Sequence, residues 1–222
     1  MKVLSSRTED RETLQDLGRA SIQIVHDLKN QLNGLKLYAT FLRKRLEKSE
    51  RPEDEQETIA KLIAGLDRAA SDLATIVEYG RQIELKKQSG YEMQKVLRTV
   101  FASFDGPGAQ IVMDPGSDSV QGNFDPSKLT DAFRWISNAA IKYRQMEDGK
   151  EAAPVSVKVA ALDNTDAIIE WSGLRKIDHD PFRSFAGSEE IRLALAAKII
   201  EAHGGSAALA DDRFIVQLPL SG

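Results

Sequence analysis

The chain has 222 residues, of which 41% are hydrophobic and 29% are charged, and its net charge is -4. This composition is ordinary for a globular protein, and it gives no reason to expect binding to nucleic acid or to an anionic membrane surface. Cysteine is absent, which excludes disulfides, thiolate metal sites and cysteine nucleophiles. We find neither an apolar run long enough to cross a bilayer nor a signal-peptide stretch, so we expect a cytoplasmic protein without membrane contact.

The first half of the sequence predicts two long helices. Apolar residues recur at steps of three and four from Leu14 to Leu46, and again from Ile59 to Ile83. A polar segment over residues 49–55 separates the two runs. Two such helices form an antiparallel hairpin, which we place at residues 1–88. A single hairpin leaves much of its apolar stripe uncovered, so we expect a homodimer in which two copies form a four-helix bundle.

The second half, beyond Gln88-Ser89-Gly90, has a mixed pattern. Helices are expected near residues 91–104, 125–145 and 189–202, and strands near 109–113, 155–161, 167–171 and 214–218. Asp125-Pro126 provides a cap and a first-turn proline for the middle helix, and Gly204-Gly205 ends the last one. The predicted fold class is therefore α+β, with the helical hairpin followed by an α/β sandwich over residues 91–222.

One histidine of the first predicted helix has neighbours suited to phosphoryl chemistry. His26 falls at heptad position f, facing away from the apolar stripe, and Asp27 follows it directly. Asn30 lies one helical turn beyond His26, and Gln31 stands in the same relation to Asp27. A neutral imidazole can attack phosphorus, a carboxylate can accept a proton or hold one tautomer, and an amide can orient water. The plain alternative is a solvated surface histidine.

The segment from Val25 to Leu32 resembles the phosphoacceptor box of sensor histidine kinases. That box contains His, an acidic residue, two variable positions and then Thr or Asn, which His26, Asp27 and Asn30 match. A sister family has Gln at the position of Gln31. The resemblance implies phosphoryl transfer at His26, with Asp27 as base and Asn30 or Gln31 in dephosphorylation. Gln31 also replaces the proline usual in the family, so we do not expect the family's helix bend here.

Residues 91–222 resemble the ATPase lobe of the same kinases at core and capping positions, but not where the family holds nucleotide. The matching segments are 125–129, 194–205 and 214–220. The resemblance places Trp171 where the family has its adenine-binding Asp. The two N-box asparagines become Trp135 and Ala139, with Asn138 one residue away, and the three glycines of the last box become Ser188, Glu190 and Arg192. We therefore expect no bound nucleotide or other cofactor.

The other two histidines give weaker indications. His179 lies between Asp178 and Asp180, which are metal-ligand types, but adjacent loop residues rarely chelate one ion, so we expect no metal. His203 is expected to interact with the dipole at the end of a helix.

A phosphoacceptor hairpin followed by a lobe without ATP chemistry resembles the histidine phosphotransferases of bacterial phosphorelays. That resemblance implies a dimer that carries phosphoryl on His26 and exchanges it with an aspartate of a receiver domain in a response regulator. Two alternatives remain open: an active histidine kinase with an unusual nucleotide site, and a pseudo-kinase that acts as scaffold or phosphatase. The sequence names neither the receiver, nor the direction of transfer, nor the input signal.

Overall fold

The computed structural model describes residues 25, 28–30, 32–44, 53–104, 110–144, 153–163 and 165–220. The chain divides into two compact units, Met1–Arg81 and Gln82–Gly222, which we call the helical unit and the α/β unit. Among the described residues, we find no helix with both the length and the hydropathy of a membrane span.

The helical unit contains a helical segment over residues 32–44 and the long helix α2 (Glu53–Gly80). An ion pair of 2.5 Å joins Lys36 Nζ to Asp67 Oδ1 and so ties the two helices together. Ala39 and Thr75 are buried. α2 ends at Gly80, earlier than the apolar pattern up to Ile83 suggested, and Arg81 donates its backbone N–H to the Glu78 carbonyl.

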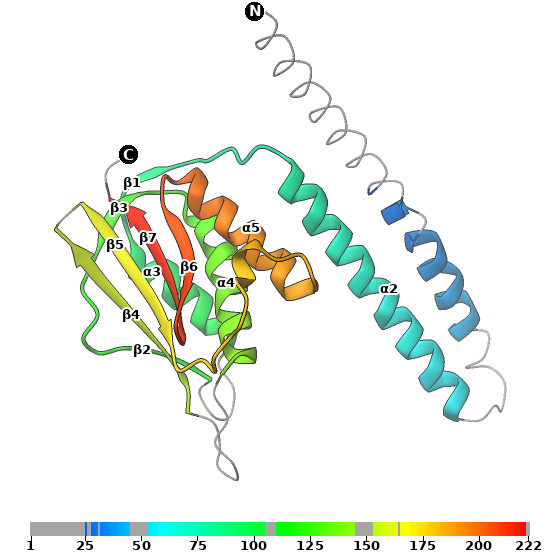
Figure 1. Cartoon of the computed structure of the whole chain (residues 1–222). Coiled ribbons are helices and arrows are strands. Elements are labelled where there is room, and N and C mark those ends of the chain that lie inside the picture. The colour runs from blue at the N-terminus through cyan, green and yellow to red at the C-terminus, as the bar shows by residue number, and fades with distance from the viewer. Residues whose placement is uncertain are drawn as a thin grey trace, which may run out of the picture. The chain divides into compact units, whose positions relative to one another are not determined.

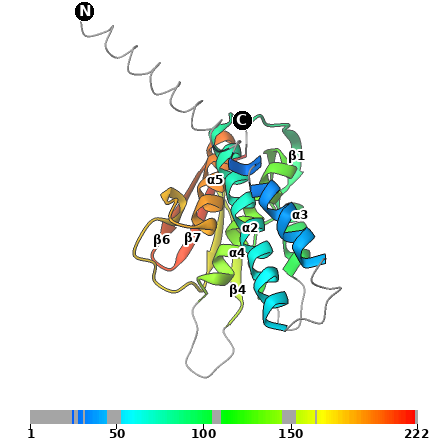
Figure 2. The same ribbon diagram turned by 90° about the vertical axis from the view of Figure 1, so that its right-hand side faces the viewer.

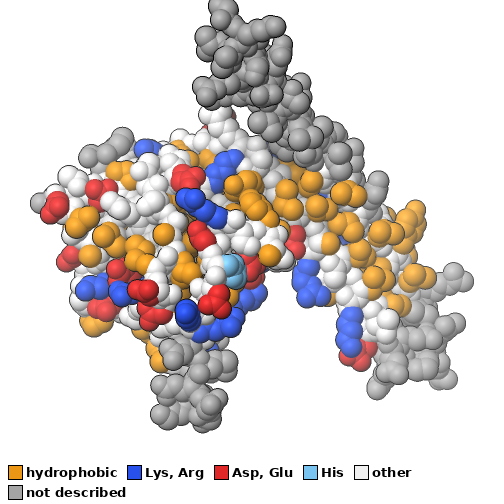
Figure 3. Space-filling model, viewed as in Figure 1, with side chains coloured by type: hydrophobic (Ala, Val, Ile, Leu, Met, Phe, Trp, Pro, Cys, Tyr) orange, Lys and Arg blue, Asp and Glu red, His pale blue; other side chains and the backbone are white. Residues whose placement is uncertain are grey.

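A row of leucines on the helical unit is left uncovered. Leu28, Leu35 and Leu42 follow one another at seven-residue spacing, and they are 44%, 54% and 54% exposed. Figure 3 shows hydrophobic side chains gathered along both helices of this unit. The hairpin alone does not cover the stripe, and the four-helix bundle remains a prediction.

The α/β unit is built on a mixed five-stranded sheet, in the order β2-β4-β5-β7-β6. β2 is parallel to β4, and the other neighbours are antiparallel. A separate antiparallel pair joins β1 and β3. The strands are β1 (Gln88–Glu92), β2 (Ile111–Met113), β3 (Gln121–Phe124), β4 (Val155–Leu162), β5 (Asp166–Ser172), β6 (Ser206–Ala210) and β7 (Arg213–Pro219).

Three α-helices cover one face of the five-stranded sheet, as Figures 1 and 2 show. They are α3 (Met93–Phe101), α4 (Pro126–Lys142) and α5 (Ser188–Ala202), and two short 3-10 turns lie at Ala102–Phe104 and Pro181–Arg183. Strand side chains alternate between the two faces of a sheet, so every second residue of β5 and β7 meets the helices. Ile169, Trp171, Phe214 and Val216 are all fully buried there. The prediction of an α+β fold with a mixed α/β unit is confirmed.

The caps of α4 and α5 form as the sequence indicates. Asp125 Oδ1 accepts the Lys128 N–H at 3.0 Å, with Pro126 in the first turn. Gly204 takes a φ of 88° just after α5. A Cβ on Gly205 would lie 2.1 Å from the Gln217 carbonyl oxygen, so only glycine fits where the chain turns back.

Three strands were not predicted: β1, β3 and β6. Gln88-Ser89-Gly90, which the sequence indicated as the boundary between the two halves, lies within β1, where Gly90 adopts a φ of 66° at an irregularity in the pairing with β3. These strands are short and contain small or polar residues, so local sequence carries little strand signal. Their pairing partners stabilise them instead.

Candidate functional site

Most of the predicted phosphoacceptor constellation lies outside the described residues, namely His26, Asp27 and Gln31. Asn30 is described: it is helical and exposed, while Val25 and Lys29 beside it are half-buried. The roles of all four candidate residues therefore remain predictions.

Two large exposed apolar side chains of the helical segment 32–44 did not feature in the sequence analysis. Leu37 is 54% exposed and Phe41 is 60% exposed. At about 100° per residue, an α-helix directs positions 37 and 41 within about 20° and 60° of position 26. The leucines at 28, 35 and 42 point about 160–200° away from that direction. Their spacing of 11 and 15 residues from His26 is the sequence signal that identifies Leu37 and Phe41.

In the α/β unit, Trp171 occupies the interior between β5 and α4. Its indole is fully buried and donates Nε1–H to the Ser137 hydroxyl at 3.0 Å. Its ring centroid lies 5.5 Å from that of Phe133, at a tilt of 57°. The position assigned by resemblance to an adenine-binding carboxylate therefore holds a large side chain with a hydrogen-bond partner inside the protein.

The α4 positions compared with the two N-box asparagines have different environments. Ala139 is fully buried and offers no ligand atom, while Trp135 is half-buried. Asn138 is exposed and donates its side-chain amide to the Arg134 carbonyl at 3.0 Å. One residue of offset on a helix has therefore turned this amide away from the buried side of α4.

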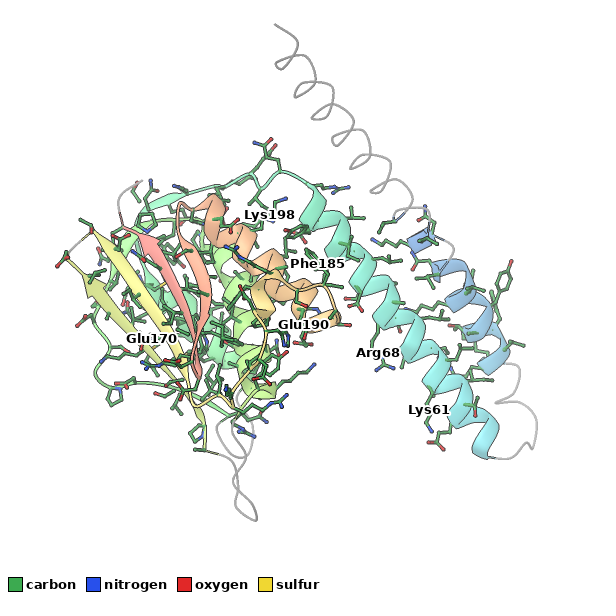
Figure 4. The ribbon with its side chains drawn as sticks, in the orientation of Figure 1. Lys61, Arg68, Glu170, Phe185, Glu190 and Lys198 are labelled. Carbon is green, nitrogen blue, oxygen red and sulfur yellow. The ribbon has the colours of Figure 1, made fainter. Side chains whose placement is uncertain are left out.

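The first turn of α5 carries two carboxylates, of which Glu190 stands where the resemblance expects a glycine and Glu189 lies directly before it. Glu190 Oε1 accepts a hydrogen bond from the Tyr143 hydroxyl at 2.9 Å and lies 3.8 Å from His179 Nε2. Glu189 Oε1 pairs with Lys142 Nζ at 2.7 Å. Figure 4 labels Glu190 at this start of α5. These contacts connect the beginning of α5 to the end of α4.

The contact with Glu190 also affects the acidity of Tyr143. Partial burial, together with the hydrogen bond and the negative charge of Glu190, raises the pKa of Tyr143 to about 12. Arg175, whose guanidinium lies 5.5 Å from the centre of the Tyr143 ring, acts in the opposite direction. Tyr143 therefore remains a neutral hydrogen-bond donor to Glu190 at ordinary pH.

Metal-ligating side chains do not gather in the part of the chain that the structure describes: no group of three His, Asp or Glu residues is placed there to hold an ion. The nearest arrangement in chemical type is His179 beside Glu190, whose carboxylate already accepts the Tyr143 hydroxyl.

The fold resembles solved structures of histidine kinases, although no protein-family model and no curated protein sequence matches the chain. Full-length ShkA in complex with AMPPNP aligns over 89% of this chain, with a TM-score of 0.66 and 18% identity. The histidine kinase AdeS of Acinetobacter baumannii aligns over 86% of this chain and 95% of its own, with a TM-score of 0.56 and 17% identity. The chain has a histidine-kinase fold.

The histidine-kinase fold extends over both units, since each alignment includes far more than the α/β unit alone. The chain spans 44% of the length of ShkA. At such low identity the likeness establishes the architecture, and the chemistry has to be argued from the residues of this chain.

Proposed function

We propose that the protein is a two-component signalling protein that carries a phosphoryl group on His26 and exchanges it with an aspartate of a receiver domain. The observation that carries this proposal is the agreement of two independent features. The segment from Val25 to Leu32 matches a phosphoacceptor box, and the chain has the fold of the kinases that use such a box. The exposed, helical position of Asn30 is compatible with access by a partner.

The proposed transfer is a displacement at phosphorus. An imidazole nitrogen of His26 attacks the phosphorus of the receiver's acyl phosphate, a P–N bond forms, and the P–O bond to the receiver carboxylate breaks. Asp27 accepts the proton that the ring loses as phosphoimidazole forms, and the reverse reaction returns both groups. Asn30 or Gln31 would orient water for hydrolysis of the partner's phosphoryl group.

Exchange with a receiver is favoured over ATP-dependent phosphorylation by the contents of the α/β unit. Trp171 fills space between β5 and α4, Ala139 offers no metal ligand, and Glu190 brings negative charge to the start of α5. A carboxylate near nucleotide phosphates is repulsive, whereas glycine backbone N–H groups attract them. ShkA holds AMPPNP with the same fold, so the proposed difference lies in side chains rather than in architecture.

A homodimer is the second part of the proposal. The leucines at 28, 35 and 42 form an exposed row that a second copy would cover in a four-helix bundle. Burial of each leucine side chain contributes roughly 1.5–3 kcal/mol, which is enough for three of them to matter in each subunit.

The receiver is proposed to dock on the opposite side of the same helix. Leu37 and Phe41 would remain exposed in the bundle because helical spacing turns them away from the leucine row, toward the direction that an uninterrupted helix would give to position 26. A receiver domain that reaches His26 would meet them about 16–22 Å along the helix, at 1.5 Å per residue. Large exposed apolar side chains beside a reactive group are suited to such transient docking.

The test is incubation of the purified protein with radiolabelled ATP alone, and separately with receiver domains that carry a radiolabelled acyl phosphate. We expect label to enter the protein from a receiver and not from ATP, and to be lost in acid but retained in base, as a phosphoramidate requires. His26→Ala should abolish labelling while the dimer persists. Labelling from ATP would favour the kinase alternative, and unchanged labelling of His26→Ala would refute the proposal.

A further inference from the structure

The edge strand β6 has backbone groups that pair with no other strand in the described part of the chain. β6 is the last strand of the five-stranded sheet and pairs with β7 on one side only (Figure 1). The two strands are joined by the two-residue turn Asp211-Asp212, and Ala210 lies opposite Arg213. In a hairpin with a two-residue turn, the two residues that flank the turn form a hydrogen-bonded pair. Along an antiparallel ladder, hydrogen-bonded pairs alternate with pairs whose backbone groups point away from the partner strand. The N–H and C=O groups of Ala207 and Leu209 therefore face the open edge.

The sequence of β6 lacks the residues that usually protect an edge strand. Its sequence is Ser-Ala-Ala-Leu-Ala, with no charged residue and no proline. Edge strands commonly carry lysine, proline or a bulge that discourages pairing with another chain. Its regular register with β7 also shows no bulge. Small side chains further allow another strand to approach closely.

A cavity lies where a side chain of an added strand would point. Leu209 pairs with the buried Phe214, so Leu209 and Ala207 lie on the helix-covered side of the sheet. On that side, a cavity of about 450 Å³ is lined by Leu209, Ile177, Lys176, Asp211 and Asp212. A residue of a new strand opposite Leu209 would project to the same side. Leu209 and Ile177 give the cavity an apolar part of its lining for that residue.

The rim of this cavity offers two opposite charges for recognition. Within the described part of the chain, neither Lys176 nor Asp211 forms an ion pair, whereas Asp212 lies 3.6 Å from Arg213 Nε. A peptide with an apolar residue between one acidic and one basic residue would complement both charges. The charge pair would also favour one direction of the added strand.

We propose that the edge of β6 and this cavity bind an extended peptide segment of a partner protein by strand addition. The segment carries an apolar side chain flanked by one basic and one acidic side chain. Backbone bonds to Ala207 and Leu209 supply most of the attraction, and the cavity with Lys176 and Asp211 supplies selectivity. This interaction is separate from His26 chemistry and does not depend on phosphotransfer.

The decisive variant is Ala207→Pro. Proline removes the outward N–H of position 207 but none of the bonds between β6 and β7, and edge strands tolerate proline where the N–H faces solvent. Ala208→Ser is the matched control, because Ala208 is exposed on the other face and its backbone groups bond to β7. Thermal unfolding of both variants verifies that the sheet is intact.

The probes are short acetylated peptides of threonine and valine with a central leucine. In two of them the leucine is flanked by lysine and glutamate, one peptide for each order of the two charges. In the third, glutamine replaces both charged residues. Binding to the full chain is measured by fluorescence polarisation. We expect one charged peptide to bind, the glutamine version to bind more weakly, and Ala207→Pro to lose affinity by about tenfold or more while Ala208→Ser is unchanged.

Three results would overturn the proposal. One is the absence of binding by either charged peptide up to about 1 mM, a weak-affinity limit for a short peptide. Another is equal binding by wild type and a folded Ala207→Pro variant. The third is concentration-dependent self-association that Ala207→Pro abolishes, because a second copy would then be the occupant of this edge.

Discussion

The His203 imidazole accepts a hydrogen bond of 3.1 Å from the backbone N–H of Asp125, which lies 78 residues earlier in the chain. The other ring nitrogen, Nδ1, lies 2.8 Å from the Ile199 carbonyl oxygen, so this nitrogen carries the proton and the ring is neutral. Asp125 in turn accepts the Lys86 N–H at 2.7 Å. In line with the expected contact at the end of the helix, buried His203 donates to a carbonyl of the last turn of α5. Through Asp125 it also fastens the end of α5 to the start of α4.

Stability should depend on pH through His203. Burial lowers its pKa below 6.5, with the charge of Lys87 acting in the same direction, while the bond to Ile199 and the charge of Asp125 act against this. The unfolded chain then binds the proton more readily, so the contribution to stability is complete above pH 6.5 and is lost as pH falls through the folded pKa. A glutamine side chain can still accept the Asp125 N–H but does not titrate. In urea unfolding, the free energy of unfolding of His203→Gln should therefore fall less steeply with decreasing pH than that of the wild type.

The exposed His179 supplies the control for that experiment. His179→Gln is the same substitution at an exposed position, and its urea unfolding over the same pH range gives the reference for His203→Gln. If His203→Gln declined as steeply as the wild type over the same range, another group would be responsible for the pH dependence.

Trp171 and Ser137 should be energetically coupled. Trp171→Phe keeps an aromatic ring but leaves the buried Ser137 hydroxyl without its donor, at a cost of about 1–3 kcal/mol beyond the loss of volume. Ser137→Ala should reduce the additional loss caused by Trp171→Phe. A double-mutant cycle from chemical unfolding measures the coupling, and we expect it to exceed about 0.5 kcal/mol. Strict additivity would show that this hydrogen bond does not stabilise the β5–α4 contact.

Nucleotide binding should be weak or absent, and Mg²⁺ should not improve it. The reasons are the filled position of Trp171, the buried methyl group of Ala139 and the carboxylate of Glu190 at the start of α5. Calorimetric titration with ATP, with and without Mg²⁺, should give no saturable heat up to about 1 mM. Low-micromolar binding would mean that the nucleotide positions were wrongly assigned from the resemblance.

Substitutions on two opposite faces of the first helix should affect dimerisation and receiver docking separately. Leu35→Ser with Leu42→Ser should weaken the dimer in analytical ultracentrifugation, because each change removes roughly 1.5–3 kcal/mol of apolar burial. Leu37→Ser with Phe41→Ser should leave the dimer intact but raise the receiver concentration needed for half-maximal transfer. Each pair is the control for the other. If the variant with Leu37→Ser and Phe41→Ser lost the dimer, these two residues would belong to the dimer interface and not to the receiver-docking surface.

Local sequence determined much of this protein's secondary structure. The spacing of apolar residues predicted α2, and the cap of Asp125 with Pro126 predicted the start of α4, because helix periodicity and capping depend on residues within a few positions. Gly204 and Gly205 likewise predicted the end of α5. The histidine motif was also identified from sequence alone. Sequence remains the basis for its proposed chemistry, because His26 lies outside the described residues.

Tertiary structure decided the features that depend on distant partners. β1, β3 and β6 have weak local signals, and the pairing of separate segments stabilises them. Local sequence cannot show that Trp171 reaches Ser137, or that His203 accepts from Asp125, since each contact joins residues far apart in the chain. The open backbone groups of Ala207 and Leu209 became visible only with the strand order, because an edge is a property of the whole sheet.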